Sequence, residues 1–246
     1  MKLSLILLGA AFLATPPLHA QSPFTAHKGR EVVYQGLTED FVPFNYQENG
    51  EVKGTATEVA KEAFKRAKIK ATFTVWPWAR AYKAALEKPK HFVYSTSRTQ
   101  EREKLFKWVG PIVKDEVHLA CLQNADYQPH ADFTTFKAHS VAGQYGDAPI
   151  EFLKKHGFKV TIYREEDERM QAFKKGRIAL DIVTTGSQKS YENKWNVKYK
   201  KLAYLYATDY WLAFHPSTPD SVIEALNGAL ESMRKDGTLK NITAKY

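Results

Sequence analysis

The sequence has little cysteine and only one long apolar run. Cys121 is the only cysteine among 246 residues, which excludes an internal disulfide, so the fold must depend on its apolar core. Because Cys121 lies in the apolar stretch 117–122, we expect a buried, inert thiol. Beyond the N-terminal run, no apolar stretch approaches the length needed to span a bilayer, about 20 residues.

The sequence also lacks the motifs of common catalytic and metal sites. There is no Gly-x-Ser-x-Gly, no His-Glu-x-x-His and no Cys/His pair, and the histidines show no paired ligand spacing. We therefore expect no metal and no cofactor. The formal charge of +9 favours acidic partners. However, lysines alternate with acids, and no basic arm or base-stacking motif occurs, so nucleic acid is not an expected partner.

The N-terminus has the pattern of a secretory signal peptide. Lys2 precedes an apolar run over 3–14, and a small residue, Ala20, precedes polar residues. The run is shorter than the roughly 20 apolar residues of a transmembrane helix. We predict cleavage after Ala20 and a soluble, exported, periplasmic protein.

Apolar periodicity indicates alternating strands and helices. Strands are predicted at 31–36, 71–75 and 92–95, with helices after a capping box at Thr55–Glu58 and over 79–87. A second series has strands at 117–122, 140–144, 159–163, 178–183 and 201–206, with helices over 148–155, 165–175 and 188–194. An apolar helical stripe over 222–233 follows. Strands joined by crossover helices are typical of an α/β fold with parallel sheets.

One short segment is suited to binding a carboxylate. Ser95 and Ser97 lie at the end of a predicted strand, and Arg102 follows five residues later. A guanidinium flanked by hydroxyls can donate two parallel hydrogen bonds to a carboxylate. A surface turn with an ordinary exposed arginine is the alternative on these residues alone.

This segment resembles that of periplasmic solute-binding proteins of the polar amino-acid type (extracellular solute-binding family 3). There, Ser-x-Ser-x-x-x-x-Arg precedes an aromatic-rich strand, as in 106–111 here, and the tail 224–246 is similar to the family's C-terminal segment. The resemblance implies a type II two-lobed fold, each lobe a mostly parallel sheet flanked by helices. Lobe one would comprise 22–115 and 210–246, lobe two 116–209, with hinge crossings near 114–117 and 210–213.

In such a fold the ligand lies beyond the carboxyl ends of the strands. The family's aromatic-x-Pro-Phe loop implies that Phe41 contacts the ligand, with Tyr46 as a second candidate. Trp76, Trp78 and Arg80 would supply an aromatic wall and a second cation. A tryptophan buried at a helix start is the alternative, but two tryptophans separated by one residue imply that at least one lines the cleft.

The predicted second lobe departs from the family pattern twice. At Tyr145-Gly146-Asp147, an acid replaces the first of the family's two threonines. Asp147 can hold an ammonium group or cap the next helix, and capping is the favoured role. The family's ammonium-binding Asp falls at Thr184, and Asp181 need not face the cleft. The carboxylate half of an amino-acid site is therefore intact, and the ammonium half is altered.

The resemblance implies a monomer that binds a small carboxylate-bearing solute and delivers it to an inner-membrane ABC transporter permease. A cleft enzyme of the dehydratase type is one alternative, with general acid or base candidates Glu39, Asp40, Asp147 and Asp181. A soluble accessory protein that senses the ligand is the other.

Overall fold

The computed structural model describes residues 32–246, and the predicted signal peptide lies outside the described residues. Within 32–246, no helix has both the length and the apolar character needed to cross a membrane. Cys121 is buried as expected, and burial raises the pKa of its thiol.

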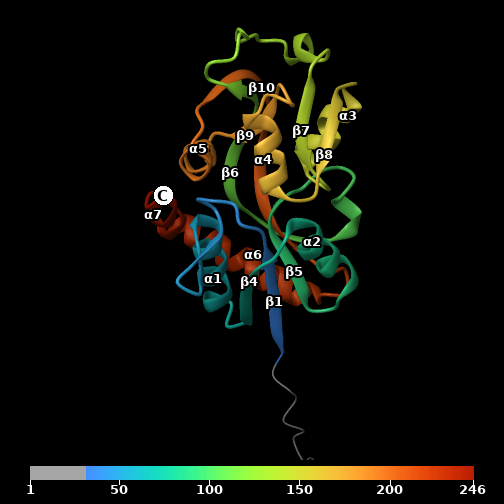
Figure 1. Ribbon diagram of the computed structural model, residues 1–246. Helices are drawn as coiled ribbons and strands as arrows, with labels where there is room; N and C mark the ends of the chain where they lie inside the picture. The colour runs from blue at the N-terminus through green and yellow to red at the C-terminus, as the bar shows by residue number, and fades with distance from the viewer. Residues whose placement is uncertain (1–31) are drawn as a thin grey trace, which may run out of the picture. The chain divides into compact units, whose positions relative to one another are not determined.

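A first series of strands and helices, residues 33–97, forms the lower half of the view in Figure 1. Its elements are β1 (Val33–Thr38), β2 (Tyr46–Glu48), β3 (Glu51–Lys53), α1 (Thr55–Arg66), β4 (Lys70–Val75), α2 (Trp78–Glu87) and β5 (His91–Ser97). Strand β1 pairs in parallel with β4 and β5, as the strand-helix alternation predicted, while β2 and β3 form a separate hairpin.

The start of α1 differs from the predicted capping box. The N-cap is Gly54, and no side chain caps the helix. Gly54 has φ +111°, and a Cβ there would lie 2.5 Å from the Phe44 carbonyl oxygen, so only glycine fits. Thr57 instead shares a 3.0 Å hydrogen bond with the Tyr94 hydroxyl, and Glu58 binds Lys245 at 3.1 Å.

Two long strands connect the two halves of the molecule in Figure 1. β6 (Lys107–Leu122) and β10 (Tyr199–Phe214) pair antiparallel within a six-stranded sheet of order β4-β1-β5-β10-β6-β9. The strands predicted at 117–122 and 201–206 are only parts of these. Both predicted hinge crossings fall inside the long strands, where Lys114 pairs with Asp209 and Val117 with Tyr206.

A second series, residues 140–195, forms the upper half of the view in Figure 1. It comprises β7 (Ser140–Gln144), α3 (Ala148–Lys155), β8 (Lys159–Tyr163), α4 (Glu166–Lys174), β9 (Asp181–Thr184) and α5 (Gln188–Trp195). Strands β7 and β8 are parallel, whereas β9 runs antiparallel to β6. Short 3₁₀ turns lie at Glu103–Leu105 and Phe133–Phe136.

The C-terminal helices pack on the first series. α6 (Asp220–Lys235) buries Leu226, Leu230 and Met233 in the same core as Phe64, and α7 (Thr238–Thr243) follows it. Arg66 fixes this end through hydrogen bonds to Asp236 at 2.6 Å and Thr238 at 2.8 Å. Burying each large side chain stabilises the fold by about 1.5–3 kcal/mol, which holds the tail in place.

Candidate functional site

Residues from both series line one space of about 100 Å³, here called the inner cavity. Most of them lie at the carboxyl ends of β1, β5, β7 and β9 or in the segments that follow, the sites that the crossover pattern indicated, and Val117, Arg169 and Tyr210 are added from β6, α4 and β10. Of the residues predicted from sequence, the structure brings together in its lining Phe41, Trp78, Ser95, Ser97, Arg102, Asp147 and Thr184.

Arg102 lies between the two series. Its guanidinium donates to the Ser97 carbonyl at 3.2 Å and to the Gly146 carbonyl at 2.8 Å. It also lies 5.1 Å from the centre of the Tyr82 ring and 5.7 Å from that of Trp78. Only 8% of Arg102 is exposed, yet among residues 32–246 it forms no ion pair with a carboxylate. A buried cation held only by neutral carbonyls is suited to receiving an anion.

The two serines of the predicted carboxylate site have different environments. Ser95 has φ +57°, and its hydroxyl donates to the side-chain oxygen of Asn45. The Asn45 side-chain nitrogen in turn donates to the Glu39 carbonyl at 2.6 Å. Ser95 therefore stabilises the loop after β1. The Ser97 hydroxyl pairs with the Thr208 hydroxyl at 3.1 Å and retains bonding capacity towards the cavity. Asn45 was missed because its role depends on a contact 50 residues away.

Two carboxyl groups face the inner cavity, Glu39 from the loop after β1 and Asp147 from the start of α3. Burial raises the pKa of Asp147 to about 6, and the neighbouring Arg169 and Arg102 only partly oppose it. Burial and the charge of Asp147 raise the pKa of Glu39 well above its usual value. Asp147 is the N-cap residue of α3, but its side chain makes no capping hydrogen bond, so the favoured capping role was wrong.

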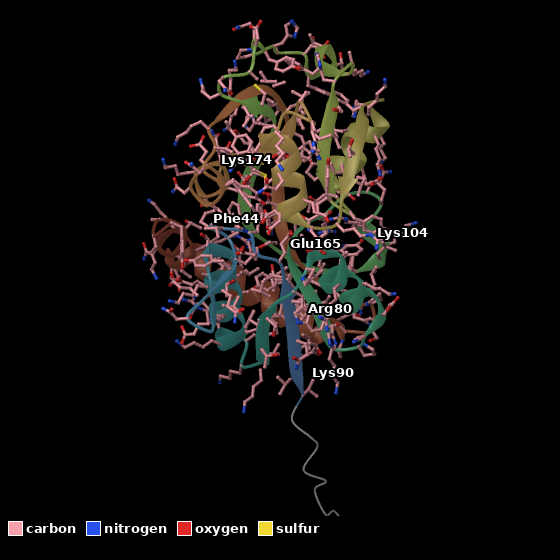
Figure 2. All side chains as sticks on the ribbon, in the orientation of Figure 1. Phe44, Arg80, Lys90, Lys104, Glu165 and Lys174 are labelled. Carbon is pink, nitrogen blue, oxygen red and sulfur yellow. The ribbon has the colours of Figure 1, made fainter. Side chains whose placement is uncertain are left out.

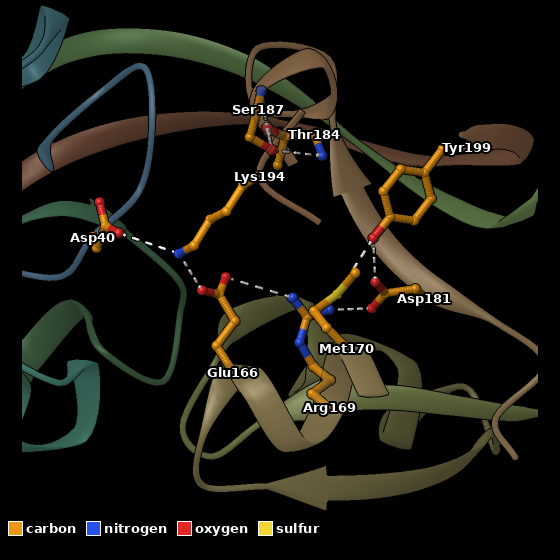
Figure 3. Close-up of polar contacts among 9 residues, drawn as sticks. All are labelled: Asp40, Glu166, Arg169, Met170, Asp181, Thr184, Ser187, Lys194 and Tyr199. Carbon is orange, nitrogen blue, oxygen red and sulfur yellow. Dashed lines mark hydrogen bonds and ion pairs between the residues drawn. The ribbon is translucent and has the colours of Figure 1, made fainter. Parts of the chain in front are cut away.

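A buried charge cluster, drawn in Figure 3, adjoins the inner cavity through Arg169. Arg169 of α4 lines the cavity and pairs with the fully buried Asp181. The Tyr199 hydroxyl donates to the other Asp181 oxygen at 2.8 Å. Asp181 is absent from the cavity lining, and it neutralises Arg169 instead. Arg169 was not predicted from the sequence, where its only signal was a charge on the buried face of a predicted helix.

An ion-pair bridge joins the two series near the cavity. Lys194 of α5 binds Asp40 at 3.2 Å and Glu166 at 2.6 Å, so one ammonium group connects the loop after β1 with α4 (Figure 3). Thr184 is turned inward, where its hydroxyl donates to the Ser187 hydroxyl at 2.8 Å. A neutral threonine so occupied does not replace the acid that the family carries at that position.

Several predicted site residues lie elsewhere. Tyr46 begins β2 and is absent from the lining of the inner cavity. Trp76 is also absent, and the Arg80 guanidinium stacks 4.0 Å from its ring centre. Arg80 lines a separate space of about 440 Å³ opposite Glu165, and both are labelled in Figure 2. Tyr145 is 65% exposed, outside the inner cavity.

A larger space of about 1190 Å³, here called the outer cavity, adjoins the inner one. Both are lined by Trp78, Ser97, Arg102 and Ala148, which form the boundary between them. Gly146 closes this boundary, because its carbonyl accepts hydrogen bonds from Arg102 and from the Trp78 indole at 3.2 Å.

Comparison with known proteins identifies related sequences over nearly the whole described chain. The family model of bacterial extracellular solute-binding proteins, family 3, matches residues 33–246. A curated relative from Bacillus subtilis (strain 168), the probable amino-acid-binding protein YxeM, is 24% identical over 263 residues. That match covers 100% of this chain and 95% of the relative.

Solved structures share the fold. An ancestral arginine-binding protein bound to arginine has a TM-score of 0.75 at 24% identity, covering 88% of this chain and 98% of its own. The arginine-, lysine-, histidine-binding protein ArtJ from Geobacillus stearothermophilus has a TM-score of 0.76 at 16% identity, covering 88% and 95%. A histidine kinase sensor domain similar to periplasmic binding proteins has a TM-score of 0.77 at 16% identity, with the same coverage. The predicted two-lobed α/β fold is confirmed.

Proposed function

The chain belongs to the bacterial extracellular solute-binding proteins of family 3, and from that membership we propose that it binds an α-amino acid in the inner cavity. The observation that carries this proposal is the buried guanidinium of Arg102, which faces the cavity without a carboxylate partner among residues 32–246. A ligand carboxylate would replace a neutral carbonyl as its acceptor, and charge-assisted bonds are roughly twice as strong. The Ser97 hydroxyl would donate to the second carboxylate oxygen.

The ligand's ammonium group would lie between Asp147 and Glu39. These two carboxyl groups line the same 100 Å³ space, one from each series. An ammonium group would relieve their mutual repulsion and offset the burial that raises both pKa values. The pair thus supplies the negative charge that the sequence lacks at Thr184, and the named functions of the relatives support an amino acid as ligand.

Transport is the role that family membership supports. We place the mature protein in the periplasm after cleavage at Ala20, as a monomer that presents its ligand to an inner-membrane ABC transporter permease. Closure of two lobes around a ligand is a common way to signal occupancy to a partner. The likeness to a sensor domain supports ligand reporting to a signalling partner as the alternative role.

One observation favours a second candidate function. Asp147 has its pKa raised to about 6, in the range useful for a general acid or base, and Glu39 lies beside it. A dehydratase acting on a carboxylic acid would use such a pair. The family consists of binding proteins, so binding is the preferred function. Chromatographic detection of a product from a carboxylic-acid substrate would favour the enzyme.

Titration calorimetry of the mature protein against the common amino acids tests the binding proposal. For the best ligand, Arg102→Ala should weaken affinity by about 2–5 kcal/mol, since it removes one partner of a buried charge pair. The matched control is Arg80→Ala, which removes an exposed arginine outside the inner cavity and should leave the affinity unchanged. Wild-type affinity in Arg102→Ala would refute the carboxylate assignment.

A further inference from the structure

We propose that the ligand's side chain leaves the inner cavity past Arg102 and lies in the outer cavity, so that the protein selects amino acids with a large aromatic side chain. This inference rests on the proposed binding of an amino acid and names the class of amino acid. It depends on the sizes of the two cavities, the boundary between them and the residues that line the outer one.

The inner cavity is too small for a large amino acid. Its volume of about 100 Å³ is below the roughly 150 Å³ of a protein cavity that accepts one benzene molecule. The ammonium, Cα and carboxylate groups therefore fill it, and a bulky side chain must extend elsewhere. The outer cavity, at about 1190 Å³, exceeds the roughly 300–1000 Å³ of typical ligand sites and adjoins the inner one directly.

Ligand binding would itself open the boundary between the cavities. The Gly146 carbonyl holds Arg102 at 2.8 Å and the Trp78 indole at 3.2 Å. A carboxylate that takes over the Arg102 donors would release that carbonyl, because the ionised acceptor is the stronger one. Gly146 has φ +80°, and a Cβ there would lie 3.5 Å from the Trp78 indole nitrogen, so a group of about methyl size fits beside the indole.

The outer cavity has aromatic walls and an apolar rim. Tyr82, Tyr206 and Trp211 line it, with Trp78 at the boundary. Its rim includes Leu105, 42% exposed, and Tyr145, 65% exposed, both among the large hydrophobic residues that are exposed in residues 32–246. Exposed apolar side chains grouped at a concave site are typical of binding surfaces.

Most charged side chains that line the outer cavity are paired with a neighbour, which favours a neutral ligand side chain. Lys155 pairs with Glu101, and Lys154 with Glu151 at 3.0 Å, so these groups neutralise one another. Asp209 also lines the wall, and it forms no ion pair among the described residues. An indole or phenol, which has an apolar ring and one hydrogen-bond donor, matches this combination.

Calorimetry with L-tryptophan, L-alanine and L-arginine tests the inference. The variant Ala207→Trp places a bulky ring in the outer cavity from an exposed position, while Ala225→Trp adds the same ring to the exposed side of α6 as control. We expect the wild type and Ala225→Trp to bind tryptophan more tightly than alanine. Ala207→Trp should weaken tryptophan binding about tenfold or more, about 1.4 kcal/mol, and leave alanine binding unchanged.

Two results would overturn the inference in distinguishable ways. In the first result, alanine or arginine binds at least as tightly as tryptophan, and this binding is lost in Arg102→Ala but unaffected by Ala207→Trp. The amino-acid site then stands, and the ligand side chain does not use the outer cavity. If wild-type protein binds none of the twenty common amino acids, the proposed function fails and this inference fails with it.

Discussion

The buried pair of Arg169 and Asp181 gives the sharpest prediction about stability. Asp181 is fully buried and Arg169 is only 6% exposed, so both charges depend on each other. Asp181→Asn keeps the shape and removes the negative charge, which leaves a buried guanidinium with Glu166 as its nearest acid at 3.9 Å. Breaking a buried pair in this way costs about 3–5 kcal/mol of unfolding free energy.

The Tyr199 hydroxyl makes the prediction more specific. It donates to Asp181 at 2.8 Å, a bond to a charged acceptor worth about 1.5–3 kcal/mol. Tyr199→Phe should therefore destabilise the protein by less than Asp181→Asn. In the double variant the two losses should not add, because the hydroxyl has lost its charged partner already.

Urea unfolding followed by tryptophan fluorescence measures these effects, and thermal unfolding offers a second reading. For a chain of this size, 3–5 kcal/mol corresponds to a fall in midpoint temperature of about 6–20 °C. The control is Asp126→Asn at an exposed position, with an expected change within about 0.5 kcal/mol. A loss below about 1 kcal/mol in Asp181→Asn would show that Glu166 or water compensates Arg169, and the reasoning would be wrong.

Three further predictions follow from single residues. The pKa of Asp147 is raised to about 6, so the carboxyl becomes protonated between pH 7 and pH 5, and calorimetry should show about tenfold weaker amino-acid binding at pH 5. This pH dependence should be absent in Asp147→Asn. Because the raised pKa means that the folded state binds the proton more tightly, the protein without ligand should lose stability as the pH rises from about 4 through 6. In Gly186→Ala the new methyl would overlap the Phe44 ring, which should hold the series apart and lower ligand affinity with small change in unfolding free energy. Gly228→Ala, at an open position in α6, should raise the unfolding midpoint in urea by stabilising the helix by about 0.8–1 kcal/mol.

The local elements could be predicted because their signals are local. Apolar periodicity located α1, α2 and α3 to within a few residues, and the spacing from Ser97 to Arg102 singled out two residues that the structure brings together in the lining of the inner cavity. The long strands β6 and β10 were only partly found. Charged residues at 114–116 and the Gly110-Pro111 pair interrupt the alternation that marks a strand, although pairing between β6 and β10 continues past them.

The remainder of the site depends on contacts between distant residues. Asn45 reaches Ser95 across 50 positions, and Arg169 acquires its role from Asp181 and from the cavity together. Trp76 and Trp78 differ by two positions, yet only Trp78 lines the inner cavity, whereas the Trp76 ring lies against the Arg80 guanidinium. No spacing rule distinguishes such neighbours before the chain is folded.

The proposed ammonium end of the site would replace a missing residue from another element. Coulomb attraction depends on the distance between charges and on the local dielectric, and it is indifferent to which strand carries the acid. Thr184 cannot supply the charge, but Glu39 and Asp147 both reach the inner cavity, one from each series. An acid at Thr184 would attract the ammonium group to the second series alone. With an acid on each side, a bound ammonium group attracts each series towards the other. Glu39 and Asp147, in the proposed role of the family's single aspartate, would therefore couple the charge of the ligand directly to closure of the two series around it.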